Sequence, residues 1–444
     1  MRNVKYRIVQ IPLFDFKGME KYLEDMASKG WRLEKTGRYV WKYRWKEPAK
    51  LHYAVTYSPD ASDFNPGPTA GQQSLEELCA AAGWQKAGEW SKMQIFVSEE
   101  ENPVPLETDE ALRLEVIDKA MGRSFIPGAV LMIVMGMVYC VPNIIGLIWN
   151  PVRFFENGMN LVSLVLWSLI LALYCYNLWI YRRWYRKSLQ SAAHGGPCAE
   201  VGPYETVNTA AIALLLMIIA WLFLIILRLH DSSYAILIAA HISLYLLLLF
   251  LIEQARKFLK RMGASWGTNI GALILVSIIG SAILVAITFG LIQDMNSNRA
   301  EEIQDIPLTL EELNGVPYED VRRDILPQGI GSFLITDKLY WDTGVRITPE
   351  GERVQESLSY EIKDVKTEWL YGKALEQFLE PKSTWKPIGA ASWSADQAYC
   401  RYRNGKPSNT YLLCWPGRLV SLTLDSTPAA EQMAAIGRKL APGI

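Results

Sequence analysis

The sequence predicts a multi-domain membrane protein with an N-terminal α+β ferredoxin-like sandwich, a five-helix transmembrane bundle and a C-terminal α+β extracellular domain. Two observations lead to this prediction. Apolar residues make up 50% of the 444 residues, and they concentrate in five long runs between residues 126 and 292. The flanking segments, residues 1–98 and 293–444, instead show the mixed apolar and charged patterns of soluble domains.

Each of the five central runs is long enough to cross a bilayer, which requires roughly 20 mostly apolar residues. A buried helix of a soluble protein is the alternative, but such helices are shorter and usually carry a polar stripe. The predicted spans are Ile126–Trp149, Met159–Tyr181, Val207–Leu227, Tyr234–Ile252 and Thr268–Ile292.

The distribution of Lys and Arg predicts the orientation of these spans, because cytoplasmic flanks carry an excess of both residues. One set of flanks holds only Arg153, Arg228 and Arg299. The other set is predicted to be cytoplasmic and holds Arg113, Lys119, Arg123, Arg182, Arg183, Arg186, Lys187, Arg256, Lys257, Lys260 and Arg261. With five crossings, the N-terminus is predicted to be cytoplasmic and the C-terminus extracellular.

Aromatic residues stand at the predicted span ends, where an interfacial ring can be half hydrated. The positions are Trp149, Trp179, Tyr181, Trp184, Tyr185 and Tyr234. A basic cluster beside Trp184 predicts a membrane anchor that contacts anionic head groups, or simply a topology signal; its members are Arg182, Arg183, Arg186 and Lys187. His241 is the one acidic or basic side chain well inside a run, where it could bond a neighbouring helix or carry protons.

The N-terminal domain shows the element order β-α-β-β-α-β, which predicts the ferredoxin-like sandwich. A weak internal repeat accompanies this order, because each helix ends in a Gly-Trp pair: Gly30-Trp31 and Gly83-Trp84. Glycine takes the left-handed conformation that ends a helix, and the following Trp can then pack between helix and sheet. The two Trp side chains could instead line a ligand cleft.

Three stretches of this domain resemble the DUF2812 family: KYRI at Lys5–Ile8, FDFKGMEKYLEDMASKGWRLEKTG at Phe14–Gly37, and LEELCAAAGWQKAGEW followed by KMQIFV. That family is a bacterial domain of unknown function, often joined to several spanning helices and often encoded beside PadR-type regulators. The resemblance implies a cytosolic domain in residues 1–98 and a PadR-type regulator as a candidate partner. It implies no catalytic or ligand-binding residue.

Residues 99–125 are predicted to be an acidic linker that opens into an amphipathic helix, with Leu112, Leu114, Val116 and Ile117 on the way to the first span. This helix could transmit motion or act as a passive spacer. The C-terminal domain is predicted to contain a β-meander over residues 398–424 and a closing helix that starts at Pro428.

Cys400 and Cys414 are the only cysteines predicted to lie outside the cell, where a disulfide can persist. If Tyr402 faces Leu412 in the meander, Cys400 faces Cys414 at a separation that can allow a disulfide. We therefore predict that these two cysteines can be bridged.

The sequence contains no nucleotide-binding or zinc-protease motif, and its C-terminal domain contains no histidine. We therefore expect no enzyme, no cofactor, no metal site and, given a net charge of −1, no direct nucleic-acid partner. The layout favours a regulatory or signal-relaying protein that couples an outer domain to a cytosolic partner-binding domain. The alternative is an accessory subunit of a membrane transport or export complex, bound to a permease.

Overall fold

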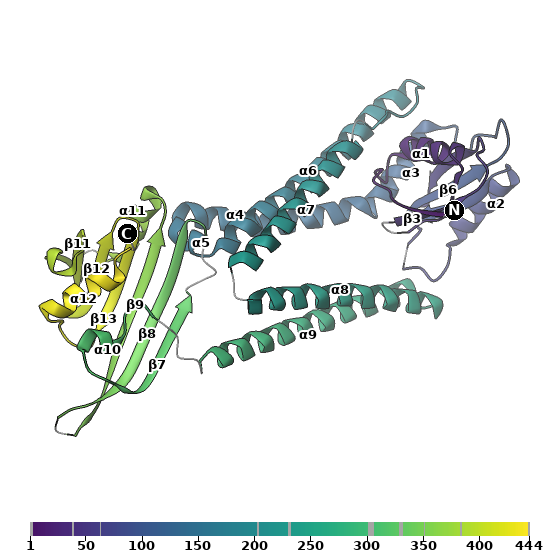
Figure 1. The fold of residues 1–444 in the computed structure, drawn as a ribbon. Coiled ribbons are helices and arrows are strands. Elements are labelled where there is room, and N and C mark those ends of the chain that lie inside the picture. Colours follow the sequence, from purple (N-terminus) through teal and green to yellow (C-terminus); the bar gives the residue numbers. More distant parts are fainter. Residues whose placement is uncertain are drawn as a thin grey trace. The chain divides into compact units, whose positions relative to one another are not determined.

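The computed structural model describes residues 3–37, 40–62, 64–201, 204–229, 232–300, 306–327, 332–349, 351–381 and 384–442. The chain forms two compact units (Figure 1). The first unit combines Met1–Met137 with Ser168–Leu291, and the second combines Val138–Trp167 with Ile292–Ile444.

The N-terminal domain consists of two consecutive β-α-β-β units, each with its own three-stranded antiparallel sheet. The first contains β1 (Val4–Ile8), α1 (Phe16–Ser28), β2 (Trp31–Lys35) and β3 (Val40–Trp45), and the second contains β4 (His52–Tyr57), α2 (Ala70–Ala81), β5 (Gln85–Trp90) and β6 (Met93–Ser98). The strand orders, β1-β3-β2 and β4-β6-β5, are equivalent.

A ferredoxin-like sandwich would join four strands in one sheet, so the predicted strand arrangement of this domain is wrong. Two features differ from the expected order. Residues 31–45 form a hairpin of two strands, and the strand Gln85–Trp90 was not expected. The hairpin and the strand Gln85–Trp90 carry several charged residues, which weaken the apolar alternation that is typical of a strand.

The repeated Gly-Trp pairs mark the same position in both units. Gly30 and Gly83 follow α1 and α2 with φ angles of 82° and 81°, values at which a side chain is strained. Trp84 is buried, whereas Trp31 is partly exposed and lies edge-on to Trp45 with ring centroids 5.2 Å apart. The repeat in the sequence therefore reflects a repeated supersecondary structure.

Helix α3 (Glu110–Gly122) belongs to the core of the N-terminal domain and does not act as a linker. Leu114, Ile117, Ala120 and Met121 are buried in the core that α1 forms with both sheets. Leu112, which the sequence placed with this apolar face, is 58% exposed. Asp109 caps the helix by accepting hydrogen bonds from the amides of Ala111 and Leu112.

The central region contains five long helices and the short helix α5 (Pro151–Glu156). The long helices are α4 (Phe125–Trp149), α6 (Gly158–Ala193), α7 (Tyr204–Leu229), α8 (Ser232–Arg261) and α9 (Trp266–Ala300). Among the described residues, three segments are long and apolar enough to span a membrane: Phe125–Trp149, Asn160–Ala193 and Trp266–Leu291. Many of their large apolar side chains are exposed, which is compatible with insertion into a bilayer.

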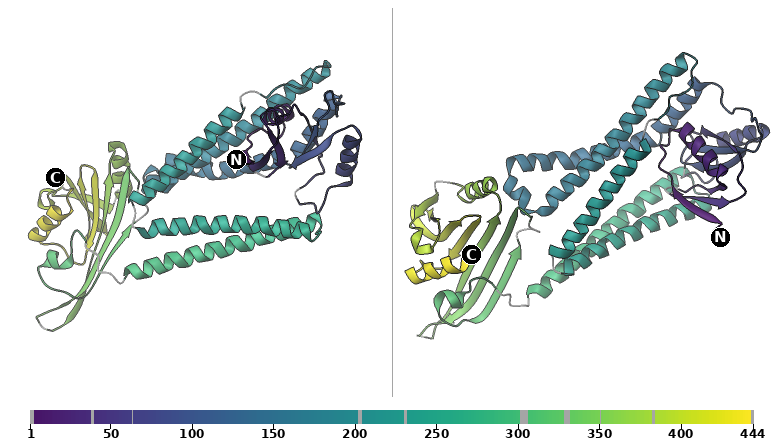
Figure 2. Two further views of the ribbon diagram at one scale, coloured as in Figure 1. Left: turned by 45° about the vertical axis from the view of Figure 1, so that its right-hand side comes forward. Right: turned by 45° about the horizontal axis from the view of Figure 1, so that its top comes forward.

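Among the described side chains, close contacts join α8 to α9 and α4 to α6, and the five-helix bundle stays a prediction. Helices α8 and α9 run side by side in all views (Figures 1 and 2), and a Cβ atom at Gly280 would overlap Leu248. By contrast, a Cβ atom at Gly271 or Gly290 would meet nothing within 4 Å. Close helix packing through a glycine is therefore seen at Gly280 and not at Gly271 or Gly290.

The C-terminal domain is built on one seven-stranded antiparallel sheet in the order β10-β11-β12-β13-β9-β8-β7. The strands are β7 (Glu319–Pro327), β8 (Ile335–Ile347), β9 (Arg353–Val365), β10 (Trp385–Ile388), β11 (Gln397–Arg403), β12 (Lys406–Trp415) and β13 (Arg418–Leu424). One apolar core includes residues of α10 (Leu310–Asn314) and α12 (Ala430–Leu440). A second core includes residues of α11 (Glu368–Phe378) and α5.

The predicted disulfide is wrong because the register of the hairpin differs from the expected one. Cys400 pairs with Tyr411 and Cys414 pairs with Gln397, with an irregularity between Cys400 and Tyr402. Cys400 packs in the core with α10 and α12, whereas Cys414 packs in the core with α11. The two thiols therefore lie on opposite faces of the sheet, and both are free.

We predict that Cys400 and Cys414 react with an alkylating reagent when the full-length protein is denatured without reductant. Side chains on opposite faces of a sheet cannot approach to the distance of a disulfide. Peptide mass spectrometry should find both residues alkylated. Recovery of a bridged Cys400–Cys414 peptide under these conditions would contradict the observed register.

Candidate functional site

Helix α6 extends beyond its predicted end at Tyr181 and packs into the core of the N-terminal domain. Tyr181 and Trp184 are 1% and 4% exposed. The ring of Phe14, which precedes α1, lies 5.1 Å from each of their rings, and Phe125 at the start of α4 lies 6.0 Å from Tyr181. This aromatic junction, formed by Phe14, Phe125, Tyr181 and Trp184, joins α6 to the domain.

Hydrogen bonds fix the orientation of the aromatic junction. The hydroxyl of Tyr181 donates to Asp118 of α3 at 2.6 Å, and the indole N–H of Trp184 donates to the carbonyl of Ala199 at 2.9 Å. Lys17 of α1 donates to the carbonyl of Cys198 at 2.7 Å. The segment after α6 thus returns along the junction and contacts α1 as well.

The predicted aromatic belt is wrong at these two positions, since Tyr181 and Trp184 pack against protein. Trp149 and Trp179, at 84% and 54% exposed, are accessible as an interfacial belt requires. An aromatic residue among arginines fits both a lipid interface and a docked helix. Only the orientation around the helix axis distinguishes the two.

Two glutamates of α1 satisfy the open edge of β4. The amide of Val55 donates to Glu20 at 2.9 Å, and the amide of Tyr53 donates to Glu24 at 3.3 Å. These carboxylates occupy the positions at which another strand could pair. Burial raises the pKa of Glu20 to about 7, and the hydrogen bond from Val55 opposes this shift.

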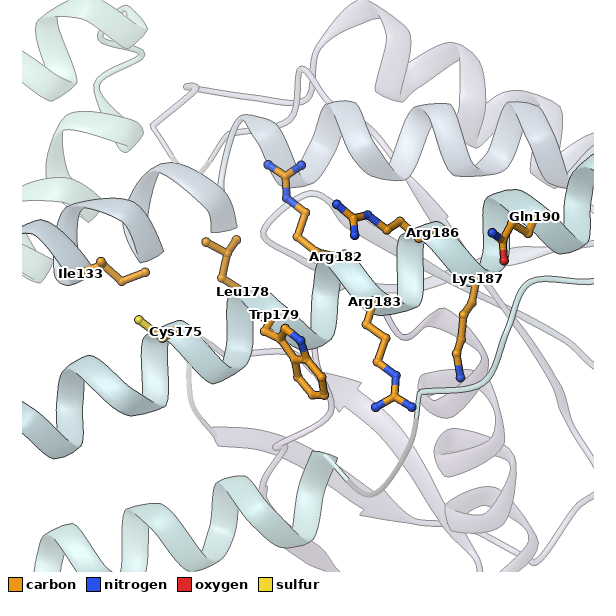
Figure 3. A pocket seen from close by; sticks show the side chains of 9 residues that line it. All are labelled: Ile133, Cys175, Leu178, Trp179, Arg182, Arg183, Arg186, Lys187 and Gln190. Carbon is orange, nitrogen blue, oxygen red and sulfur yellow. The ribbon is translucent and has the colours of Figure 1, made fainter.

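A shallow groove lies between α4 and the exposed face of α6 (Figure 3). It has a volume of about 540 Å³, and one end is apolar while the other is cationic. The residues lining this basic groove are Ile133, Cys175, Leu178, Trp179, Arg182, Arg183, Arg186, Lys187 and Gln190. The guanidinium of Arg183 lies 5.2 Å from the ring centroid of Trp179, within the range of a cation–π contact.

A buried ionic cluster connects α5 to the sheet of the C-terminal domain. Lys363 of β9 is 5% exposed and donates to Glu156 of α5 at 2.7 Å. It also forms ion pairs with Asp337 at 3.1 Å and Glu361 at 3.3 Å. Burial raises the pKa of Asp337 to about 7, although the nearby ammonium of Lys363 lowers it. Val152 of α5 adds apolar contact to the same face.

A family model described as a protein of unknown function, DUF2812, matches residues 15–127. Residues 15–127 therefore form a DUF2812 domain. This confirms the expected family. Comparisons with curated proteins and with solved structures gave no match.

The DUF2812 match places α3 with the N-terminal domain, in agreement with the packing of that helix. Matched residues run from Asp15, the N-cap of α1, through α3 into the first residues of α4. They include Phe125, but they begin directly after Phe14 and end before Tyr181. The matched segment thus supplies Phe125 to the aromatic junction, and α6 supplies Tyr181 and Trp184.

The remaining predicted site residues do not form one cleft in the DUF2812 domain. Trp84 is buried beside Cys79 and Phe96 and donates to the carbonyl of Val104 at 2.8 Å, whereas Trp31 packs against the core of α1. The side chain of His241 lies outside the described residues. Among the residues that the structure describes, no group of three His, Cys, Asp or Glu side chains could hold a metal ion.

Replacing Glu20 by Gln should remove a pH dependence of the DUF2812 domain. Because the pKa of Glu20 is raised from 4.5 to about 7, the folded state binds the extra proton and stability falls as the pH rises from about 4.5 to 8. A glutamine at this position still accepts the hydrogen bond from the amide of Val55 but carries no charge. We expect Glu20→Gln to match the wild type at pH 4 and to be more stable by about 1–3 kcal/mol at pH 8.

Hydrogen exchange of the β4 amides in the full-length protein, corrected for intrinsic rates, measures this effect. Glu24→Gln is the matched control on the same helix and should keep the wild-type pH dependence. Equal pH profiles for Glu20→Gln and the wild type would show that burial does not raise the pKa of Glu20 in the folded protein.

Replacing Lys363 by Met should destabilise the second unit. The change leaves the carboxylate of Asp337, whose side chain is 4% exposed, without its counter-charge, which typically costs about 3–5 kcal/mol. Hydrogen exchange should increase in both α5 and β9. Addition of Asp337→Asn should restore part of the protection, because it removes the buried charge.

Lys373→Met is the control, since Lys373 pairs with Glu376 on the exposed side of α11; its effect should stay within about 0.5 kcal/mol. Unchanged exchange in α5 after Lys363→Met would show that the cluster does not hold this helix.

Proposed function

We propose that this protein is a multi-pass membrane protein of the regulatory or signal-relaying type. It couples a C-terminal domain outside the cell to a cytoplasmic DUF2812 domain that binds a soluble partner. The observation that carries the proposal is helix α6. It is a continuous helix of 36 residues that starts in the second compact unit and ends in the core of the DUF2812 domain.

The contacts at the two ends of α6 support coupling by a rigid element. At its start, Trp167 stacks on Tyr139 of α4 with centroids 5.6 Å apart, and the preceding α5 is bound to the sheet through Glu156 and Lys363. At its end, Tyr181 and Trp184 are fixed in the aromatic junction. A displacement at the sheet would therefore act on the DUF2812 domain through a helix and not through a flexible linker.

The proposed topology has five crossings by α4, α6, α7, α8 and α9, with the N-terminus cytoplasmic. Each of these helices has at least 25 residues, more than the roughly 20 that a span requires. The excess of Lys and Arg on one set of flanks supports this orientation. The cytoplasmic partner is proposed to be a soluble regulator, of the PadR type by analogy with the family.

Replacing Trp184 by Ala should detach the end of α6 from the DUF2812 domain, because loss of a buried Trp typically costs about 3–5 kcal/mol. Arg182, Arg183, Arg186 and Lys187 then become sensitive trypsin sites, since proteolysis requires local unfolding. The measurement is the rate of cleavage at these sites in the full-length protein in lipid nanodiscs. Trp179→Ala, five residues away and exposed, is the control and should leave the rate unchanged.

Relay through α6 also predicts that Trp184→Ala blocks long-range effects. In protein with Trp184 intact, Lys363→Met should alter hydrogen exchange in α1 and α3. In Trp184→Ala protein, the same substitution should leave those helices unchanged. An effect of Lys363→Met that is the same in both backgrounds, or absent from both, would contradict the relay.

An accessory subunit of a transport or export complex is the second candidate, favoured by the exposed faces of α8 and α9. Phe250 and Phe289 are 58% and 62% exposed, and Gly271 and Gly290 leave open space for another helix. Crosslinking mass spectrometry on native membranes distinguishes the candidates. Links from Lys21, Lys29 or Lys35 to a soluble regulator support the relay, whereas links near the spans to a permease support the accessory subunit.

A further inference from the structure

We propose that the basic groove between α4 and α6 binds an anionic phospholipid, with its phosphate at the cationic end and its acyl chains at the apolar end. The inference rests on the proposed insertion of α6 into the membrane but not on the relay. Three observations carry it: the arrangement of the groove along α6, the absence of acidic partners, and the fixed orientation of this helix.

The lining of the groove changes character along the helix in the order that a phospholipid requires. Cys175, Leu178 and Ile133 of α4 form the apolar end, and Trp179 stands at the boundary. Arg182 and Arg186 project from one side of α6, and Arg183 and Lys187 project from the other (Figure 3). Since a helix rises 1.5 Å per residue, the change occurs within about two turns, which is the scale of one lipid head group.

The four cations of the groove have no acidic partner among the described residues. Other cations near the predicted cytoplasmic ends of the helices are neutralised: Lys119 pairs with Glu115, Arg123 with Asp60, and Arg256 with Glu253. Among the described contacts, the guanidinium of Arg183 lies over the ring of Trp179, which holds it beside the apolar end. Four cations without a described acidic partner, gathered along two turns of one helix, favour an anion.

The packing of α6 determines which face carries this charge. Tyr181, Trp184 and Ser188 are buried on one face, spaced by three and four residues as one side of a helix requires. The basic residues are exposed on the remaining surface. Because the aromatic junction prevents rotation of the helix, the groove is fixed in orientation before a lipid arrives, which reduces the entropy lost on binding.

The apolar end distinguishes a phospholipid from a soluble phosphate. A free anion would use the arginines alone and would gain nothing from Ile133, Cys175 or Leu178. A phospholipid also packs its acyl chains against these side chains through van der Waals contacts. The groove therefore matches an amphiphile with a negatively charged head group.

The test is native mass spectrometry of the full-length protein released from nanodiscs of phosphatidylcholine with or without phosphatidylglycerol. We expect the wild type to retain phosphatidylglycerol in preference to phosphatidylcholine. The double variant Arg182→Gln/Arg186→Gln should weaken this retention by roughly 10–30-fold, at about 1 kcal/mol per cation. The matched control Lys260→Gln/Arg261→Gln removes two exposed charges from the end of α8 and should retain phosphatidylglycerol as the wild type does.

Equal loss in both double variants, or in neither, would overturn the site in favour of general attraction to the membrane surface. Displacement of phosphatidylglycerol by inorganic phosphate would identify a soluble anion as the ligand and would also overturn the proposal. Insertion of the Arg182→Gln/Arg186→Gln variant into nanodiscs reports on its placement in the membrane. Its resistance to trypsin at Arg183 and Lys187 reports separately on the aromatic junction. Failure of the lipid site is therefore distinguishable from failure of the proposed function.

Discussion

The insertion of Tyr181 and Trp184 into the DUF2812 core is the interaction on which the rest of this structure depends. Through these two residues, the end of an apolar helix becomes part of the core of the DUF2812 domain. Because Asp118 lies on α3, Phe125 begins α4 and Phe14 precedes α1, the contacts of these two aromatic residues reach two other helices and the segment before a third. Burial of two large rings, together with their hydrogen bonds, makes this connection costly to break.

Charged side chains form specific contacts inside both units. Glu20 and Glu24 close the edge of β4, and Lys363 holds α5 against the C-terminal sheet. Buried charges of this kind add little net stability compared with apolar residues, but removing one partner is costly. Their effect is to fix which surfaces meet, as the proposed coupling of separate domains requires.

Sequence reasoning recovered the elements whose signal is local. The apolar runs revealed the long helices, and the Gly-Trp pairs revealed a repeat because a left-handed glycine at a helix end has a specific chemical requirement. It failed where the outcome depends on distant partners. The aromatic and basic residues around Trp184 fit a lipid interface and a docked helix equally well, and an irregularity next to Cys400 shifted the hairpin register and moved the two thiols to opposite faces.

Only part of the candidate site could be predicted from the sequence. The basic cluster at Arg182–Lys187 could be recognised, but not that Ile133 of α4 completes a groove with it. The pairing of Glu156 with Lys363 could not be predicted from any local pattern, because these residues lie 207 positions apart in the chain. Nor did the spacing of Leu114 and Ile117 reveal that α3 packs in the DUF2812 core, because the same spacing suits a helix on any apolar surface.

The most direct test of the account is hydrogen exchange along α6 in the wild-type protein in lipid nanodiscs. A continuous helix docked through Tyr181 and Trp184 predicts protected amides from Gly158 through the last turns before Ala193, without a break at Tyr181. Rapid exchange that begins directly after Tyr181 would show that the helix frays where the apolar run ends. That result would contradict coupling of the two compact units through α6.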